Sequence, residues 1–294
     1  MMIRYEGSIW RPPSEARSLI LQATIGCSHN ACTFCVSYKD RQYRVRGADG
    51  ISADLAMLDK QTRERVRRVF LADGNALAMD TAEVLRTLSV LEHELPNLER
   101  VGIYGYAKDV RNKSTDDLRD IGSAGLGIVY LGLETGDDEL LRWSRKGITS
   151  RENIEACKRI RAAGIPLSLT IILGLGGIER SETHASKTAE ALNAIDPEFV
   201  GALTLMIPPG TPLFEMTKRG EFCPMNPEES LEELRLLIEQ LDLSECVFRT
   251  NHASNYLPLA GTLNRDQRKL LDLLESVLGS KDQTPLRPEY LRGL

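Results

Sequence analysis

The sequence lacks a long apolar segment. None of its hydrophobic runs approaches the ~20 residues that a helix needs to cross a bilayer, and the longest, Leu167–Leu175 and Phe199–Ile207, have the length of strands. Residues Met1–Glu6 show no basic region followed by an apolar core, so we expect no secretory signal. These absences exclude a membrane-spanning protein as an interpretation, and we expect a cytoplasmic one.

Cysteine and positive charge are also scarce. Six cysteines among 294 residues are too few for a disulfide scaffold, which agrees with a reducing compartment. The formal net charge is −5 and the pI is about 5.6, which argues against a broad nucleic-acid-binding face. Two short basic runs are the exceptions, Arg41–Arg46 and Arg63–Arg68. The second falls on an expected helix, where a solvated charged face is the ordinary interpretation.

Three of the six cysteines, Cys27, Cys32 and Cys35, fall within nine residues directly after an apolar run. Thiolates are soft ligands, and three from one short loop suit an iron–sulfur cluster or zinc. No fourth cysteine follows at ligand spacing, so one coordination position is left open, as in a catalytic metal centre. Two alternatives remain: His29 completes a structural zinc site, or the three cysteines are ordinary buried residues.

Apolar runs alternate with helical patterns through most of the chain. The runs contain little polar alternation, as expected for strands covered on both faces, and each intervening helix can return the chain for a parallel strand. We therefore predict an α/β fold built on a parallel sheet. The six expected strands are Leu19–Thr24, Val69–Ala72, Val101–Tyr104, Ile128–Leu133, Leu167–Leu173 and Phe199–Met206.

Composition divides the chain into three parts. Residues 1–18 contain the Pro12-Pro13 pair, which excludes a regular helix, and are expected to form an extended N-terminal arm. Residues 19–212 are expected to form a barrel-like α/β domain. Beyond a proline-rich stretch the pattern becomes helical, so residues 213–294 are predicted to be a helical extension that covers the mouth of the barrel.

Capping residues indicate where individual helices begin. Ser52 is expected to cap a helix that continues to Val66, and Ser114 with Asp117 forms a capping box. A second capping box, Ser230 with Glu233, is expected to open a helix of the C-terminal extension.

Every unusual polar or glycine-rich cluster directly follows an expected strand. In parallel α/β folds, sites form at the carboxyl ends of the strands, so these clusters are expected to share one rim and form a single active site. They are Cys27–Cys35, Asp73–Asn75, Tyr104–Tyr106, Glu134–Gly136 and Gly174–Gly177.

In these motifs the chain resembles the radical S-adenosylmethionine (SAM) superfamily over residues 19–210. The resemblance rests on the cysteine triplet with Phe34, on Ala72–Asn75, on Leu131–Gly136 and on Ile171–Gly174. It implies a partial (β/α)6 TIM-like barrel in which the three thiolates hold a [4Fe–4S] cluster and SAM occupies the fourth iron. One departure is the spacing Cys-x4-Cys-x2-Cys, because the superfamily usually has three residues between the first two ligands.

The resemblance also implies the cofactor contacts. Asp73, Gly74 and Asn75 would receive the ammonium group of SAM, and Glu134 the ammonium or the ribose hydroxyls. The residue-level alternatives are a plain strand-to-helix turn and a helix-start acid favoured by the macrodipole. The full set of expected cofactor-binding residues is Phe34, Asp73, Gly74, Asn75, Glu134, Lys146 (for the methionine carboxylate, with Arg145, unless the two form a solvated helix end), Ile171 and Leu173 (for the adenine, unless they are strand core).

Substrate-directed residues are less well indicated. Asn251 and His252 begin a polar segment between apolar ones, which is expected to fold over the barrel mouth or to be a plain polar loop. Tyr106 follows the third strand on the expected rim. We interpret these three as catalytic candidates, whereas His184 is expected to be a solvent-facing or helix-capping histidine.

The function that follows is a radical SAM enzyme. The resemblance implies reductive cleavage of SAM to a 5′-deoxyadenosyl radical, here acting on a small metabolite, with an electron donor such as flavodoxin or ferredoxin. Cys223 and Cys246 have no Cys-x2-Cys partner, so a second cluster is not expected. The alternatives are an RNA substrate bound by the two basic runs, or a non-enzymatic zinc-knuckle binding module. We expect neither a nucleic acid nor a membrane partner.

Overall fold

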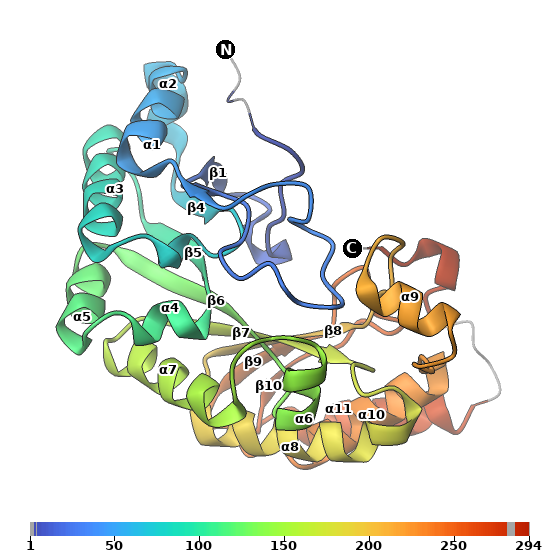
Figure 1. The fold of residues 1–294 in the computed structure, drawn as a ribbon. Coiled ribbons are helices and arrows are strands. Elements are labelled where there is room, and N and C mark those ends of the chain that lie inside the picture. The colour runs from blue at the N-terminus through green and yellow to red at the C-terminus, as the bar shows by residue number, and fades with distance from the viewer. Residues whose placement is uncertain (1–2, 4, 281–285, 294) are drawn as a thin grey trace. The chain divides into compact units, whose positions relative to one another are not determined.

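The computed structural model describes residues 3, 5–280 and 286–293, and the chain divides into two compact units. The first unit comprises residues 1–30, 37–131 and 156–167. The second comprises residues 31–36, 132–155 and 168–294. The two units are described separately below, with the element labels of Figure 1.

The first unit is built on parallel strands. They are adjacent in the order β1, β4, β5, β6, with Leu21 beside Leu71 and Leu71 beside Ile103. A two-residue antiparallel pair, β2 with β3, precedes the first helix. The elements are η1 (Pro13–Glu15, a short 3-10 turn within the arm expected to be extended), β1 (Leu19–Gln22), β2 (Thr24–Ile25), β3 (Arg44–Val45), α1 (Gly47–Ala56), α2 (Lys60–Arg65), β4 (Arg68–Ala72), η2 (Ala76–Ala78), α3 (Thr81–Glu94), β5 (Arg100–Gly105), α4 (Ala107–Arg111), α5 (Thr115–Ser123) and most of β6 (Leu126–Glu134).

The second unit continues the βα alternation and then departs from it. β7, β8 and β9 are parallel, and β10 returns antiparallel to β9. Helices α8, α10 and α11 pack side by side, and Figure 1 shows them as one layer along the strands. The elements are α6 (Asp138–Trp143), α7 (Ser150–Ala162, shared with the first unit), β7 (Leu167–Leu173), η3 (Ile178–Arg180), α8 (Ser181–Ile195), β8 (Phe199–Thr204), α9 (Pro212–Lys218), α10 (Pro227–Glu239), β9 (Cys246–Arg249), β10 (Ala260–Leu263), α11 (Gln267–Leu278) and η4 (Glu289–Leu291).

The predicted strands are all present, and their interiors are buried. Leu21, Phe70, Ile103 and Leu169 have no exposed surface. Burying one such side chain contributes roughly 1.5–3 kcal/mol, so these runs supply much of the core. The expectation of strands covered on both faces is therefore confirmed for β4 and for the interior of β5, whereas β7 and β8 alternate between buried and half-buried side chains. Among the described residues, no helix is both long and apolar enough to cross a membrane.

The first helical segment differs from the prediction. The helix expected from Ser52 is two helices, and α1 begins earlier, at Gly47. Glu83, from α3, accepts a hydrogen bond from the backbone N–H of Ala48 at 2.6 Å. Gly47 has a positive φ of 55°, and a Cβ there would lie 2.0 Å from the Glu83 carboxylate. The carboxylate satisfies an N-terminal amide of α1 from another helix, which local sequence cannot reveal.

The two predicted capping boxes have different outcomes. Ser114 and Asp117 form the expected box at the start of α5. The box of Ser230 with Glu233 is wrong, because α10 begins at Pro227 and is capped by Asn226 with Glu229. The sequence carries a second signal for this start, because Pro227 occupies the first turn, where proline favours a helix start. Glu233 is therefore inside the helix and fully buried.

The C-terminal part is not entirely helical. Besides α9, α10 and α11 it contains β9 and β10, and β9 pairs in parallel with β8. The run Cys246–Arg249 is only four residues long and ends in a charged residue, so its apolar pattern was too short to indicate a strand by itself. The segment forms a strand because its backbone hydrogen-bonds to the edge of β8, a contact that the local sequence does not reveal.

The N-terminal arm is held by a buried carboxylate that the sequence did not single out. Glu15 has no exposed surface. Its carboxylate accepts hydrogen bonds from Arg100, Tyr130 and Ser18. A buried charge with several donors is well compensated, so this contact anchors the arm within the first unit.

Candidate active site

The turn after β4 packs tightly against the first cysteine. A Cβ on Gly74 would lie 2.4 Å from the carbonyl oxygen of Gly26 and 2.7 Å from the Cα of Cys27. Contacts that short do not occur between real atoms, so only glycine fits. The close approach of the backbone here requires the missing side chain.

Asn75 continues this contact with the next residue of the cysteine loop. Its Oδ1 accepts a hydrogen bond from the Ser28 N–H at 2.9 Å. Its amide nitrogen donates to the Ser28 hydroxyl and to the Asp109 carboxylate. Tyr106 packs against the ring of His29, with ring centroids 5.0 Å apart. Asn75 and Tyr106, both predicted site residues, thus support the residues that follow Cys27.

Asp73 is fully buried and only half satisfied. Its Oδ2 accepts hydrogen bonds from the Gly26 N–H, Gln22 and Arg41, at 3.2–3.3 Å. Its Oδ1 has no hydrogen-bond partner among the described residues. Burial raises the pKa of this carboxyl, and the bonds from Gly26, Arg41 and Gln22 oppose that rise. A buried oxygen without a hydrogen bond destabilises the fold. Asp73 Oδ1 could accept a hydrogen bond from a ligand, such as an ammonium group.

The extra residue between Cys27 and Cys32 lies in a stretch with a left-handed turn. Asn30 has a φ of 42°, a conformation that asparagine tolerates better than most residues. Its side-chain amide donates to the Tyr38 carbonyl at 2.7 Å, and its own carbonyl accepts from Lys39 at 2.6 Å. The loop therefore accommodates the insertion through a turn that is bonded to the segment beyond the third cysteine.

Cys32 and Cys35 lie on a segment that belongs to the second unit. Thr33 between them donates its N–H to the Ser144 carbonyl at 2.9 Å and accepts from the Leu213 N–H at 3.1 Å. The predicted Phe34 is half-buried in the same segment. Through these two backbone hydrogen bonds, the end of α6 and the start of α9 hold the segment in place.

The three clustered cysteines are more exposed than Cys157 and Cys246. Cys27, Cys32 and Cys35 are not in disulfides and are partly exposed, whereas Cys157 and Cys246 are buried. A core role for the triplet is thus not supported, while Cys157 is core as predicted. Across the described part of the chain, no group of three or more His, Cys, Asp or Glu side chains is already arranged to hold a metal ion. The fit to a cluster rests on three accessible thiols, the soft donors that iron–sulfur clusters use.

Glu134 and Lys146, predicted from separate motifs, form one buried ion pair. Lys146 Nζ lies 2.7 Å from Glu134 Oε1, and both residues are less than a tenth exposed. Glu134 has a φ of 64°. A Cβ on Gly132 would lie 2.0 Å from Glu134 Oε1, so the glycine leaves room for the pair. An amine and a carboxylate are thereby presented together at the end of β6.

A second buried pair, which sequence reasoning missed, lies behind the end of β7. Glu233 Oε1 accepts from the Gly174 N–H at 2.6 Å and lies 3.1 Å from His184 Nδ1. His184 is 1% exposed, so its expected solvent-facing position is wrong. Burial disfavours the imidazolium, but the Glu233 carboxylate outweighs burial and raises the pKa of His184. The error follows from the misplaced capping box, which assigned Glu233 to a helix end.

The predicted adenine contacts lie on the buried face of β7. Ile171 is 0% and Leu173 3% exposed, while the alternate residues Thr170 and Ile172 are half-buried. Alternation places successive side chains on opposite faces. The face with accessible surface therefore carries Thr170 and Ile172, which the sequence reasoning did not select.

The segment with Asn251 and His252 is hydrogen-bonded to Arg287, near the C-terminus. Arg287 donates to the carbonyls of His252, Ala253 and Asn255 at 2.8–3.1 Å. His252 Nδ1 accepts from the Ser254 N–H at 3.1 Å, so a neutral ring carries its proton on Nε2. Burial and the nearby Arg287 lower the pKa of His252. Asn251 is exposed.

The tight packing at Gly74 makes a specific prediction. In Gly74→Ala the new Cβ would displace Cys27, so we expect reconstituted protein to retain less than about half of its iron and to lose about 1–3 kcal/mol of unfolding free energy. Gly201→Ala is the matched control, because a Cβ at Gly201 meets nothing within 4 Å. Iron per chain and thermal unfolding measure both effects. Equal iron retention in the two variants would contradict the assigned role.

Comparison with known proteins identifies a family model and relatives of similar sequence. The family model of the radical SAM superfamily matches residues 21–187. A tRNA-2-methylthio-N(6)-dimethylallyladenosine synthase from Bordetella petrii is 26% identical over 216 residues, which cover 70% of this chain and 44% of the relative. A tRNA uridine(34) acetyltransferase from Methanocaldococcus jannaschii is 30% identical over 106 residues, which cover 35% and 19%. The chain thus matches less than half the length of these relatives.

Solved structures with the same fold include two enzymes. Methylornithine synthase matches with a TM-score of 0.54 at 18% identity, over 77% of this chain and 63% of that one. Coproporphyrinogen III oxidase from Escherichia coli, a radical SAM enzyme, matches with a TM-score of 0.55 at 16% identity, over 76% and 51%. These likenesses confirm the predicted fold class, an α/β partial TIM-like barrel.

Proposed function

This chain belongs to the radical SAM superfamily, and on that premise we propose that its substrate is a small metabolite rather than RNA. As a radical SAM enzyme it uses a [4Fe–4S] cluster and SAM. When bound, the cluster supplies the electron that splits SAM into methionine and a 5′-deoxyadenosyl radical.

The residues divide the binding work. Cys27, Cys32 and Cys35 would hold the cluster. Asp73, whose Oδ1 has no partner in the described chain, would accept a hydrogen bond from the ammonium of SAM. The paired Glu134 and Lys146 offer an acceptor for ribose hydroxyls and a cation for the carboxylate. Gly74 and Asn75 act through the cysteine loop that they support.

The single observation that favours a small substrate is that the arginines of the first basic run, Arg41–Arg46, are all in ion pairs. Arg41 lies 3.3 Å from Asp73, Arg44 is paired with Glu6, and Arg46 lies 2.8 Å from Asp54. All three guanidinium groups are neutralised by carboxylates of the first unit. Contact with RNA phosphates would require those pairs to break.

Only some arginines of the second basic run, Arg63–Arg68, are available to bind phosphate groups. Arg63 is paired with Glu94, and Arg67 lies 3.8 Å from Glu99. Arg65 and Arg68 are exposed. Two exposed arginines on a chain with a net charge of −5 make a weak anchor for RNA, because each phosphate contact contributes modestly.

A tRNA substrate is the second candidate, and the curated relatives favour it. The two relatives named above are, by their names, enzymes of tRNA. Since this chain spans less than half of either, the residues that those proteins use on tRNA need not be present here.

The test compares two substrate pools under anaerobic reduction. We expect the reconstituted enzyme to form 5′-deoxyadenosine several-fold faster with a small-molecule filtrate of a bacterial extract than with total tRNA. We also expect tRNA binding to be weak and to change little with salt, in contrast to the steep dependence of phosphate-bound complexes. Stimulation by tRNA alone would reverse the assignment, and its salt dependence would identify the phosphate contacts.

A further inference from the structure

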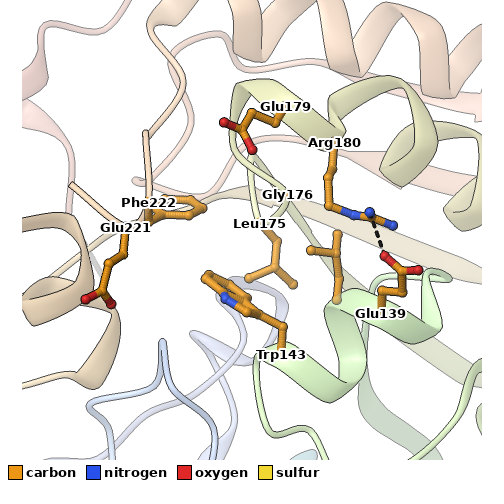
Figure 2. Close-up of a pocket in the computed structure, with 9 residues that line it drawn as sticks. Glu139, Trp143, Leu175, Gly176, Glu179, Arg180, Glu221 and Phe222 are labelled. Carbon is orange, nitrogen blue, oxygen red and sulfur yellow. Dashed lines mark ion pairs between the residues drawn. The ribbon is translucent and has the colours of Figure 1, made fainter. Parts of the chain in front are cut away.

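The second unit contains a pocket that none of the residues assigned to the cluster or to SAM lines. Its volume is about 200 Å³, and it lies where the loop after β7 meets α6 and the segment after α9. Figure 2 shows the side chains that face it. The lining residues are Glu139, Leu140, Trp143, Leu175, Gly176, Glu179, Arg180, Glu221 and Phe222.

Two glycines show that the pocket walls are closely packed. A Cβ on Gly176 would lie 3.1 Å from Arg180 Cβ and 3.2 Å from Leu140. Gly177, with a φ of 60°, would place a Cβ 2.7 Å from the Cys223 carbonyl and 3.1 Å from the Phe222 ring. The backbone at Gly177 therefore requires glycine, and a side chain at Gly176 would be crowded.

One side of the pocket is aromatic. Trp143 and Phe222 stack with centroids 5.4 Å apart and an interplanar angle of 30°. Leu140 also lines the pocket, and Figure 2 shows Leu175 beside the aromatic rings. Aromatic rings attract cations through their electron-rich faces, and the effect is largest for tryptophan.

The charges of the pocket do not cancel. Arg180 is bound by two carboxylates, Asp137 and Glu139, each at 2.6 Å. Glu221 is paired with Arg219 at 2.5 Å. Glu179 has no ion-pair or hydrogen-bond partner among the described residues. Glu179 is exposed, and two carboxylates share the single guanidinium of Arg180, so the pocket carries an excess of negative charge.

The geometry points to a guanidinium cation as the ligand of this pocket; we propose that Glu179 binds it while Trp143 and Phe222 provide the aromatic surface. A planar guanidinium can make two parallel hydrogen bonds to one carboxylate and stack on an aromatic ring. An anionic ligand would be repelled by the Glu179 carboxylate, and Arg180 could not attract it because its charge is already neutralised by Asp137 and Glu139. A neutral ligand would leave the Glu179 charge without a partner.

Tryptophan fluorescence gives a local readout because the chain has only two tryptophans. In a Trp10→Phe background, Trp143 is the sole tryptophan and is excited selectively over tyrosine while the purified full-length chain is titrated with butylguanidinium. We expect a saturable change, with butylurea, the neutral isostere, binding at least ~10-fold more weakly. Butylammonium separates a planar cation from a point charge, and a cation that binds equally well would replace the guanidinium assignment.

Glu179→Gln keeps the size of the side chain and removes its charge. We expect it to weaken butylguanidinium binding at least ~10-fold without a change in melting temperature. Glu182→Gln, nearby in α8 and not part of this pocket, is the control and should bind like the parent. Equal binding by Glu179→Gln, or by butylurea, would overturn the proposal. Because the assay needs no reductant, its result is independent of the radical chemistry.

Discussion

Cys32→Ala is expected to abolish the cluster and with it SAM cleavage. Cys32 and Cys35 are held on one short segment by the backbone bonds of Thr33, and Cys27 by its contact with Gly74. With three thiolates and no fourth cysteine at ligand spacing, the loss of one leaves two. Changing a residue that merely supports a ligand commonly costs 10–100-fold in metal affinity or activity, so removing a ligand should exceed ~100-fold.

The measurement is iron content after anaerobic reconstitution, together with 5′-deoxyadenosine formed under reduction. Cys223→Ala is the matched control, since Cys223 is a free and exposed cysteine outside the loop. We expect the control to retain iron and activity. A Cys32→Ala protein that binds as much iron as the control would show that the loop is not the cluster site, and one zinc per chain would instead support the zinc-knuckle alternative.

His184→Ala is expected to cause the largest loss of stability. The change leaves Glu233, which is fully buried, without its ion-pair partner. Breaking a buried pair from one side typically costs about 3–5 kcal/mol, because a buried charge remains uncompensated. Glu233 also holds the Gly174 N–H, so the end of β7 should loosen as well. Denaturant unfolding measures the cost, and His93→Ala, at an exposed position, is the control.

The same pair gives a pH dependence with a defined sign. The pKa of His184 is raised in the folded protein, so the folded state binds the proton more tightly than the unfolded state. The stabilisation is fully present below the unfolded pKa of about 6.5 and is lost as the pH rises through the folded pKa. We expect wild type to lose stability over that interval relative to His184→Gln. Parallel pH profiles of the two proteins would show that His184 is not charged in the fold.

Local patterns were sufficient for much of the architecture. The six apolar runs are strands because their length and apolar composition suit a largely buried sheet, which can be recognised without information from elsewhere in the chain. Ser114 with Asp117 could be identified because a capping box is a contact within four residues. The three clustered cysteines were identified by spacing alone, and their partial exposure agrees with a ligand role.

Other features depend on partners distant in sequence. Glu83 sets the start of α1 from another helix, and Glu233 reaches His184 and Gly174 across 49 and 59 residues. Neither contact leaves a periodic or capping signal, so the sequence placed Glu233 at a helix end and His184 in solvent. Likewise, Ile171 and Ile172 are equivalent in composition, and only the register of β7 decides which face is accessible.

The cysteine loop shows where the two kinds of information meet. The sequence by itself determined that Cys27, Cys32 and Cys35 lie close along the chain and that one residue is inserted between the first two. Only the tertiary structure showed that Gly74 and Asn75 pack against the loop and that Asn30 adopts a left-handed turn. Spacing is a covalent property of the chain, whereas support from a turn 47 residues away exists only once the strands have paired.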